Sequence, residues 1–492
     1  MTTRPDEHDQ TTTPVATGVD PDALATTLAV LAQVEQLPVD HPDALAVQRA
    51  TAKIYKTVRT RRRRERIDAI RANDDAVDAR TATAAPGRID DETAGIPLVS
   101  EAKGATAGRL LRSRSCYVCK EHFVDVDAFY HQLCPPCAAK HHAKRDARTD
   151  LTGRRALLTG GRAKIGMYIA LRLLRDGADL TITTRFPRDA ARRFAELPDS
   201  ADWLHRLRIV GIDLRDPAQV VALTDEIRAR GHLDILVNNA AQTVRRSADA
   251  YAPLVRAEQA PLPSGPLPEI LTLGRAAEER QVAALPEPDA EHWSPTPDVL
   301  ASMALTARSA TFDQVEVGRA IDAGGLVPDL VSTNTWVQTV DEVDPLELLE
   351  VQLCNQTAPF ILVSRLRAAM AASPARRTYV VNVSAMEGQF GRGYKAPHHP
   401  HTNMAKAALN MLTRTSAKEM LDTDGILMTA VDTGWITDER PHTQKQRMAE
   451  IGFHAPLDLV DGAARVYDPI VRGEAGEDLH GCFLKDYERF PW

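Results

Sequence analysis

The chain has 492 residues, which is too long for one ordinary core and suggests about three domains or domain-sized segments. A formal net charge of −7 gives no reason to expect a general nucleic-acid-binding protein. No apolar run approaches the roughly 18–20 residues of a membrane helix, and the polar start MTTRPDEHDQTTTP has no signal-peptide core. We therefore expect a cytoplasmic protein without a membrane anchor.

The first residues are predicted to be a disordered tail followed by two helices. Residues 1–20 are rich in Thr, Asp and Pro and have almost no apolar side chains to bury, which is typical of disorder. A short apolar-faced helix is expected to start at Pro21. A second helix opens near Pro42 and continues past Ile70, so residues 21–80 form a helical segment.

A run of four arginines, Arg61–Arg64, makes this helical segment basic. Such a run fits a nucleic-acid patch, but it is more often a solvent-exposed helix face or a surface that docks a partner. We therefore expect a protein partner for this segment in preference to nucleic acid. Residues 81–108, which follow, are predicted from their composition to be a linker.

Four cysteines in two C-x-x-C pairs dominate the next segment, a predicted module at residues 109–150. The pairs are Cys116 with Cys119 and Cys134 with Cys137, in the spacing C-x2-C-x14-C-x2-C. Two such pairs can surround one Zn2+ with four thiolates, and a reducing cytosol favours metal binding over disulfides. Because four thiolates leave no position for water, the predicted zinc is structural; redox-active thiols are the alternative.

From residue 151 to residue 492, β-rich runs alternate with segments of helical spacing. The runs LTITT, LRIVGI, LDILVNNA, TYVVNVS and ILMTAVD are typical of buried strands. This alternation predicts an α/β fold, a doubly wound parallel sheet with helices on both faces.

One region, from about residue 244 to residue 334, interrupts the alternation. It holds nine prolines between Pro253 and Pro297 and shows no clear strand. Because unstructured loops of this length are uncommon in compact domains, we predict that the insertion is a lid or an assembly surface. We also expect the protein to be a homo-oligomer.

The stretch Arg154–Gly166, RRALLTGGRAKIG, predicts where a dinucleotide would bind. A short apolar run ends at a Gly-rich turn, and Ile165, Ile169 and Leu173 then recur at helical spacing. A strand, a turn and a helix in this order direct backbone N–H groups and the positive end of a helix dipole at a pyrophosphate. The alternative is a tight strand-to-helix turn without a ligand, but the rest of the unit follows in register.

From Arg154 to about Pro441 the chain resembles the short-chain dehydrogenase/reductase family. The segments that carry the resemblance are TGGRAKIG at 159–166, DLRD at 213–216, NNAA at 238–241, LCNQTAPF with Asn355, VVNVSA at 380–385, MAKAALNML at 404–412 and VDTGWIT at 431–437. The resemblance implies a Rossmann fold, a nicotinamide dinucleotide cofactor and oxidoreduction of a small carbonyl or alcohol. The cofactor-binding residues that it implies are Gly160, Arg162, Lys164, Ile165, Gly166, Arg185, Asp213, Asn239, Lys406 and Thr437.

The end of the second strand bears on the choice between NADP(H) and NAD(H). NAD-binding members of the family carry an acid there, whereas this chain has Arg185 and Arg188, and the turn itself holds Arg162 and Lys164. Guanidinium and ammonium groups suit a 2′-phosphate, so NADP(H) is favoured unless these cations are merely exposed helix-start residues. Lys164 stands at the family's second glycine position, as in members that resemble pteridine reductase.

The proton-handling residues of the family are displaced in this chain. Lys406 is present, but the residue four positions before it is Thr402 and not the family's tyrosine. The family's serine position falls on Ala385, with Ser384 one residue earlier. An alkyl hydroxyl is a poor general acid or base near neutral pH. The candidate catalytic residues are therefore Lys406, Asn355, Ser384 and Thr402.

Two functions remain open, an enzyme with an atypical proton relay and a catalytically silent NADP(H)-binding sensor or scaffold. The missing tyrosine and serine favour the sensor, whereas Lys406, Asn355 and Thr437 favour the enzyme, which we prefer. A histidine could carry the proton, because its pKa is nearer to neutral pH. The side chains that could replace the lost groups are Tyr394, His398, His399 and His401, with ordinary loop residues as the alternative, and Glu387 and Asp432 could also line the pocket.

Overall fold

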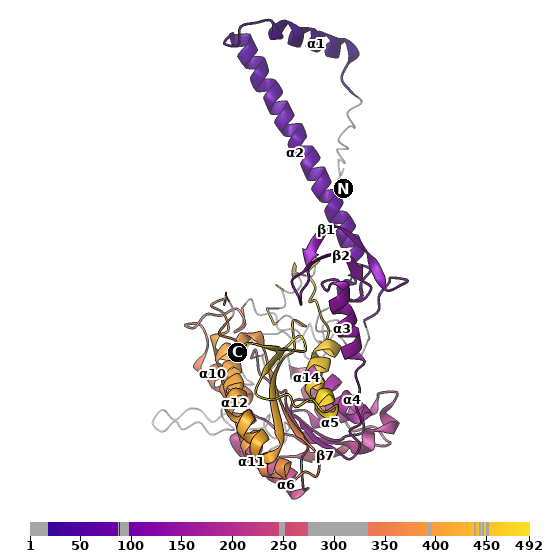
Figure 1. The fold of residues 1–492 in the computed structure, drawn as a ribbon, viewed down its shortest axis with the longest axis vertical. Helices are drawn as coiled ribbons and strands as arrows, with labels where there is room; N and C mark the ends of the chain where they lie inside the picture. Colours follow the sequence, from indigo (N-terminus) through magenta and orange to yellow (C-terminus); the bar gives the residue numbers. More distant parts are fainter. Residues whose placement is uncertain are drawn as a thin grey trace, which may run out of the picture. The chain divides into compact units, whose positions relative to one another are not determined.

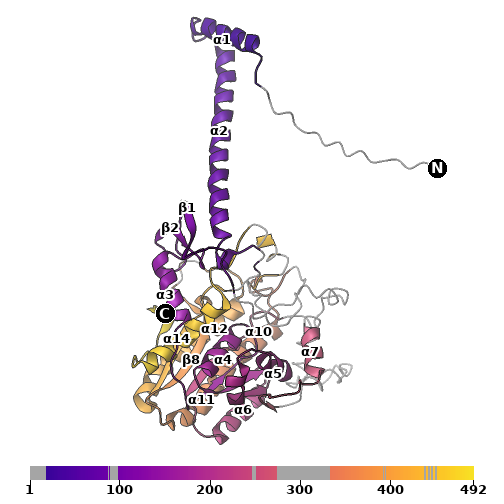
Figure 2. The same cartoon turned by 90° about the vertical axis from the view of Figure 1, so that its right-hand side faces the viewer.

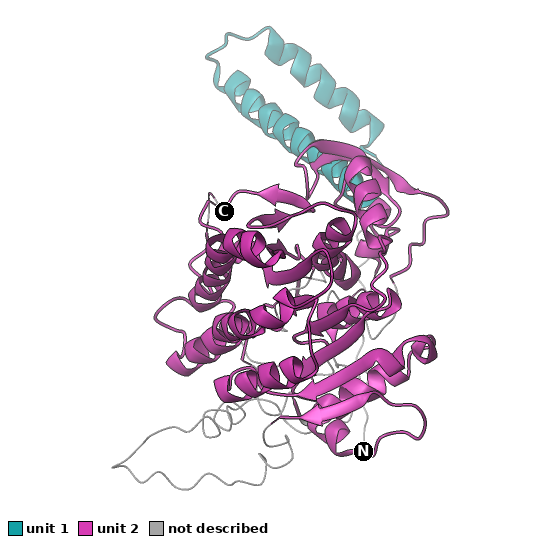
Figure 3. Cartoon of the chain, turned by 60° about the horizontal axis from the view of Figure 1, so that its bottom comes forward, with its two compact units in different colours: residues 1–73 teal, residues 74–492 magenta. Residues whose placement is uncertain are grey.

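The structure is a computed structural model, and it describes residues 18–86, 88, 98–245, 251–273, 333–391, 393, 395–436, 439–441, 444, 447–448 and 452–492. The chain divides into two compact units, residues 1–73 and residues 74–492 (Figure 3). Most of the predicted tail lies outside the described residues. Within the described part, no helix has the length and apolar character needed to span a bilayer.

The first unit contains the two predicted helices, α1 (Pro21–Glu35) and most of α2 (Pro42–Asp78). Helix α1 begins where the sequence indicates, because the Asp20 carboxylate accepts a hydrogen bond from the Ala23 N–H at 2.9 Å and so caps the helix. Helix α2 continues without a break through the arginine run. Arg61–Arg64 are all exposed on it.

The second unit is built on a parallel sheet (Figure 1). In chain order its strands are β3 (Arg155–Leu158), β4 (Asp179–Thr184), β5 (Leu207–Gly211), β6 (Ile235–Asn238), β7 (Glu269–Thr272), β8 (Thr378–Ser384), β9 (Ile426–Asp432), β10 (Phe483–Lys485) and β11 (Glu488–Phe490). Among the described residues, the spatial order is β11-β10-β9-β8-β6-β3-β4-β5-β7. All neighbouring strands run parallel except the pair β10 and β11. The predicted doubly wound sheet is confirmed.

Helices cover both faces of this sheet (Figure 2). One face carries α4 (Lys164–Arg175), α5 (Pro187–Ala195) and α14 (Leu459–Glu474), and the other carries α6 (Pro217–Ala229), α11 (Ala358–Ala371) and α12 (Pro400–Asp424). Central parallel strands are therefore buried on both sides and read as continuous apolar runs. In β3, Leu158 packs into the core under α4, whereas Leu157 packs into the core under α6 and α11.

The predicted insertion contains a strand, so the expectation of a strandless segment is wrong. Helix α7 (Ala252–Gln259) is followed by β7, which pairs in parallel with the outer edge of β5. The strand is only four residues long and follows closely spaced prolines, which conceal it in the sequence. Pairing with β7 satisfies the open backbone groups of β5. Residues 246–250 and 274–332, the greater part of the insertion, lie outside the described residues.

The start of the expected linker is folded structure. The turn Ala82–Ala84 is buried, and the Thr83 N–H donates a hydrogen bond to the Phe129 carbonyl at 2.9 Å. The prediction of a linker is wrong for these residues, because their small side chains fit a close contact that their composition does not reveal. Residues 89–97, in the middle of the expected linker, lie outside the described residues.

The cysteine-rich segment belongs to the same compact unit as the sheet. Its two strands, β1 (Thr106–Ser115) and β2 (His122–Asp127), pair antiparallel, and helix α3 (Pro135–Arg145) follows them. The segment shares apolar contacts with the Rossmann region, as described below.

Candidate functional site

A pocket of about 400 Å³ lies at the carboxyl ends of β3, β4, β5 and β6. In open α/β sheets this edge is where ligands bind. Lys406 is not among the lining residues, and Thr437 lies outside the described residues. The predicted cofactor residues that line the pocket are Gly160, Arg162, Lys164, Ile165, Gly166, Arg185, Asp213 and Asn239.

The Gly-rich turn that forms one wall of the pocket depends on residues that lack a side chain. Gly160 has a φ of +70°, a conformation that favours glycine. A Cβ on Gly166 would lie 1.9 Å from the Gly160 carbonyl oxygen, so only glycine permits this approach. From β6, the Asn239 amide donates hydrogen bonds to the carbonyls of Thr159 and Gly160, both at 3.1 Å. Asn239 thereby fixes the shape of the turn.

Two arginines at the pocket are paired with carboxylates. Arg162 donates to Asp189 at 2.6 Å, and Arg215 donates to Asp213 at 2.7 Å. Although burial opposes ionisation of Asp213, the hydrogen bonds and positive charge of Arg215 hold its pKa below the usual range. Lys164 has a φ of +52° at the start of α4, a left-handed conformation that is uncommon for a side chain of this size.

The lysine and asparagine of the expected catalytic set lie beyond the pocket lining and hold the loops around it. The Lys406 ammonium donates to the Val383 carbonyl at 2.9 Å, and burial lowers the pKa of Lys406 to about 8. Asn355 lies in a π-helical turn, Leu353–Thr357, between α10 (Pro345–Gln352) and α11. Its side chain accepts from the Gln242 N–H at 2.7 Å and donates to the Gln242 carbonyl at 2.8 Å. It therefore ties α11 to the loop after β6.

The two hydroxyl groups of the expected set do not line the pocket. Ser384 donates to the Asn410 side-chain oxygen at 2.6 Å, so it is directed into the contact between β8 and α12. Thr402 is 2% exposed, and its hydroxyl has no hydrogen-bond partner among the described residues. The structure therefore does not bring these hydroxyls together with the nucleotide-binding turn.

The substitute groups that the sequence suggested lie around the start of α12 and the end of β9. The His399 ring stacks on Trp336 with centroids 4.1 Å apart, and burial lowers its pKa. Burial also lowers the pKa of His401, to about 4, which leaves this ring neutral at pH 7. Asp432 accepts a hydrogen bond from the Met386 N–H at 3.2 Å, and burial raises its pKa to about 6.

The remaining expected residues are His398, Glu387 and Tyr394. His398 is only partly buried, and Glu387, next to Met386, contributes negative charge near Lys406 and Asp432. Tyr394 lies outside the described residues.

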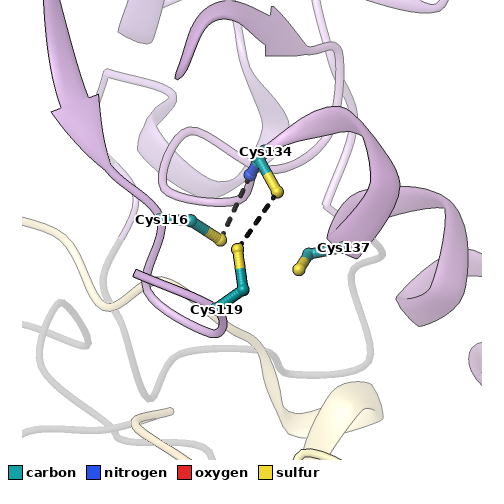
Figure 4. Close-up of side chains that lie close together, drawn as sticks. All are labelled: Cys116, Cys119, Cys134 and Cys137. Atoms are coloured by element: carbon teal, nitrogen blue, oxygen red, sulfur yellow. Dashed lines mark hydrogen bonds between the residues drawn. The ribbon is translucent and has the colours of Figure 1, made fainter. Parts of the chain in front are cut away.

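The four cysteines converge in space (Figure 4). Their sulfur atoms all lie within 4.8 Å of one another, with 3.6 Å between Cys119 and Cys134. The Cys134 N–H also donates to the Cys116 sulfur at 3.3 Å. With Zn–S bonds of about 2.3 Å, a tetrahedral site has sulfur–sulfur distances of about 3.8 Å. The arrangement fits a zinc ion, with one pair in the turn between β1 and β2 and the other at the start of α3.

This four-cysteine module packs against the segment that follows β9. Tyr117, between the first two cysteines, accepts a hydrogen bond from the Trp435 N–H at 2.9 Å. Tyr130 donates to Asp461 at 2.6 Å, at the start of α14. An apolar cluster joins module residues to Ile436, Leu457 and Ile165 of the Gly-rich turn. The module thus supports both the turn and the segment after β9.

Sequence reasoning missed two tyrosines at this site. Tyr251 lines the pocket from the insertion, where its Pro-rich surroundings gave no sign of a fold. Tyr117 lies inside a motif that was interpreted only through its cysteines. In both cases the contact joins distant segments, so no local pattern could reveal it.

The sequence matches the short chain dehydrogenase family over residues 154–254. It is 30% identical to an uncharacterized protein, R665, of Acanthamoeba polyphaga mimivirus over 368 residues, which are 73% of this chain and 71% of the relative. It is 40% identical to the oxidoreductase UcpA of Escherichia coli (strain K12) over 95 residues, only 18% of this chain and 33% of UcpA.

Among solved structures, the chain is similar to a Pseudomonas aeruginosa RhlG/NADP active-site complex. The identity is 18% and the TM-score 0.40, over 68% of this chain and 94% of the other. The family match coincides with the strands and the Gly-rich turn that form the pocket. The segment 154–254, which forms most of the pocket, therefore belongs to the short-chain dehydrogenase/reductase family.

Proposed function

We propose that this chain is an NADP(H)-dependent oxidoreductase that acts on a small carbonyl or alcohol. The observation that carries the proposal is the pocket itself, where the Gly-rich turn and Arg185 lie at the same edge of the sheet. The turn suits a pyrophosphate, and a guanidinium group suits the 2′-phosphate that distinguishes NADP(H) from NAD(H). No acid stands at the end of β4, where it would repel that phosphate.

Reduction of a carbonyl needs a hydride on carbon and a proton on oxygen. A bound nicotinamide would supply the hydride. Lys406 does not line the pocket and donates to the Val383 carbonyl at 2.9 Å, so its lowered pKa alone does not make it the proton donor. The hydroxyls of Ser384 and Thr402 are not suited to this role, since alkyl hydroxyls ionise far above neutral pH. We propose that the loss of these hydroxyls from the pocket makes the proton relay atypical.

A silent NADP(H)-binding sensor or scaffold is the second candidate, and a specific observation favours it. Thr402, at the family's tyrosine position, is enclosed, and Ser384, next to the family's serine position at Ala385, is engaged with Asn410, so neither hydroxyl is available in the pocket. Both candidates predict NADPH binding. They differ in turnover.

Binding and turnover together test these proposals. Calorimetry on the full chain should show tighter binding of NADPH than of NADH. Arg185→Ala should weaken NADPH about tenfold or more, the size of one charge-assisted contact, and leave NADH nearly unchanged. Arg228→Ala, a change of an exposed arginine on α6, is the control. A parent protein that binds NADH as tightly as NADPH would refute the cofactor assignment.

Turnover then separates the two candidates. A carbonyl panel with NADPH should reveal activity in the parent protein if it is an enzyme. Tight NADPH binding without turnover on any substrate would favour the sensor.

We also propose that the four cysteines bind one structural Zn²⁺ in a reducing cytoplasm. The convergence of four sulfurs supports this, since a structural zinc contributes directly to the folding of the segment that holds it. Metal analysis after desalting should return about one zinc per chain. A protein without zinc, or one with a Cys116–Cys119 disulfide, would overturn the assignment.

A further inference from the structure

Aromatic rings and guanidinium groups form a stack at the end of β4. The rings of Phe186 and Tyr251 lie nearly parallel, at 22° and with centroids 6.1 Å apart. The Arg185 guanidinium carbon lies 4.9 Å from the centre of the Tyr251 ring and 5.7 Å from that of Phe186. Arg185 also donates a hydrogen bond to the Tyr251 hydroxyl at 3.1 Å. All three residues line the nucleotide pocket.

Tyr251 comes from the insertion, and the helix that follows it is anchored beside the pocket. The Glu258 carboxylate on α7 accepts hydrogen bonds from the backbone N–H groups of Arg188 and Asp189, at 2.8 and 3.0 Å. These groups belong to the first turn of α5, directly after β4. Leu254, on the same helix, is 2% exposed. Together with the pairing of β7 on β5, these contacts hold Tyr251 at the pocket.

Arg185 differs from the other two pocket arginines in its partner. Arg162 faces Asp189 and Arg215 faces Asp213, so a carboxylate matches each of these charges. Among the described residues, Arg185 forms no ion pair with a carboxylate, although the charge of Asp213 acts on it from a greater distance, and its guanidinium group donates to the Tyr251 hydroxyl. A cation at a ligand pocket with a neutral partner is suited to an anionic ligand group.

An aromatic partner of this kind fixes a cation without neutralising it. An arginine side chain has many rotamers, and holding one of them before the ligand arrives lowers the entropic cost of binding. A ring under the guanidinium and a hydroxyl at its edge restrict the rotamers without adding a negative charge beside the guanidinium. An acidic partner would fix the side chain equally well but would repel a phosphate.

We propose that Tyr251 is a positioning residue that sets the preference for NADP(H) over NAD(H) by orienting Arg185 toward the 2′-phosphate. This inference rests on the proposed function, since it takes NADP(H) as the ligand of the pocket. The described part of the insertion then takes part in cofactor choice, whereas the Rossmann motifs alone assign this choice to residues at the end of β4. NAD(H) lacks the phosphate, so its affinity depends little on Tyr251.

The test measures the affinities of NADPH and NADH by calorimetry on the full chain and its variants. Tyr251→Ala should weaken NADPH about tenfold, the size of one cation–aromatic contact with its hydrogen bond. It should change NADH less than twofold. Tyr251→Phe keeps the ring and should show a smaller loss, about two- to threefold. Tyr55→Ala, a change of an exposed tyrosine on α2, is the matched control.

A double-mutant cycle with Arg185→Ala distinguishes positioning from a merely structural role. If Tyr251 acts through Arg185, Tyr251→Ala should cause no further loss of NADPH affinity once Arg185 is alanine. Equal losses for NADPH and NADH, or full additivity in the cycle, would overturn the inference. If Tyr251→Ala does not fold, Tyr251→Phe carries the test, and an unchanged NADPH/NADH ratio would then overturn it.

The outcomes also separate this inference from the proposed function. A parent protein that does not prefer NADPH contradicts the proposed cofactor, whatever the variants do. A parent that prefers NADPH, with a preference that Tyr251 variants do not alter, contradicts the role of Tyr251 alone.

Discussion

The candidate site has a nucleotide end, at the Gly-rich turn, and a reaction end, around Ser384 and Thr402. The sequence determines the geometry of the first end more directly than that of the second. At the nucleotide end, Gly160, Gly166 and Asn239 shape a turn through backbone contacts, and their motifs occur in order along the chain. At the reaction end, Ser384 stands one residue before the family's serine position and Thr402 stands at its tyrosine position, and neither side chain lines the pocket. The local sequence determines the shape of a turn that binds through its backbone, whereas the role of a side chain depends on the residue that it contacts in the folded protein.

The largest expected effect comes from removing the metal that we propose for the four-cysteine module. Cys119→Ser should abolish zinc binding and lower the melting temperature of the full chain, because a structural zinc contributes to folding directly. The module holds Trp435 through Tyr117, so turnover should fall more than NADPH affinity. Metal analysis, thermal unfolding and calorimetry check this.

A matched control for that experiment is Cys482→Ser, since this buried cysteine lies outside the module. It should leave the zinc content unchanged. If Cys119→Ser lost zinc but altered neither stability nor turnover, the module would not support the reaction end.

Gly166→Ala should have the next largest effect, and it acts on the nucleotide end. The new methyl group would overlap the Gly160 carbonyl oxygen, so the turn must open. We expect NADPH affinity to fall by about a hundredfold or more, the loss of roughly 3 kcal/mol of binding free energy. Gly104→Ala, where an added Cβ meets nothing within 4 Å, is the control. Unchanged affinity in Gly166→Ala would mean that the turn does not hold the cofactor.

Ser384→Ala tests whether the Ser384 hydroxyl at the reaction end stabilises the fold or takes part in catalysis. Removal of the hydroxyl leaves the buried Asn410 oxygen without its donor, which should cost about 2 kcal/mol of unfolding free energy. NADPH affinity should not change. Ser364→Ala, on the exposed side of α11, provides a comparison for denaturant unfolding. A hundredfold loss of turnover at unchanged stability would instead identify Ser384 as catalytic.

The smallest expected effect is a pH dependence from Lys406. Burial lowers its pKa to about 8 in the folded state, below the value of about 10.4 for an exposed lysine. The folded state therefore loses this proton first, and the group's contribution to the free energy of unfolding rises as pH increases from about 8 to 10.4.

Between pH 8 and pH 9 the rise should be about 1 kcal/mol. Lys406→Met should remove it, whereas Lys418→Met, a change of an exposed lysine on the same helix, should not. Denaturant unfolding at several pH values measures the difference. An identical pH dependence in the parent and Lys406→Met would show that Lys406 is not perturbed.

Local patterns in the sequence determined much of this protein. The strand runs, the Gly-rich turn, the start of α1 and the two cysteine pairs all formed as spacing and residue type predict. Each is set by contacts within a few residues or by the burial of a whole run, so a short window of sequence contains the necessary information. Local patterns did not predict the buried turn Ala82–Ala84 or strand β7, because the composition of both segments resembles that of a loop.

Only the tertiary structure decided which side chains meet at the site. Arg185 and Tyr251 are 66 residues apart, and Tyr117 and Trp435 are 318 apart. Ser384 could have faced the pocket, but its hydrogen bond with Asn410 directs it into the core. Such pairings depend on how helices and inserted segments pack on the sheet. A motif therefore fixes where a residue stands in the fold, whereas distant packing partners determine the direction of its side chain and the chemistry it can perform.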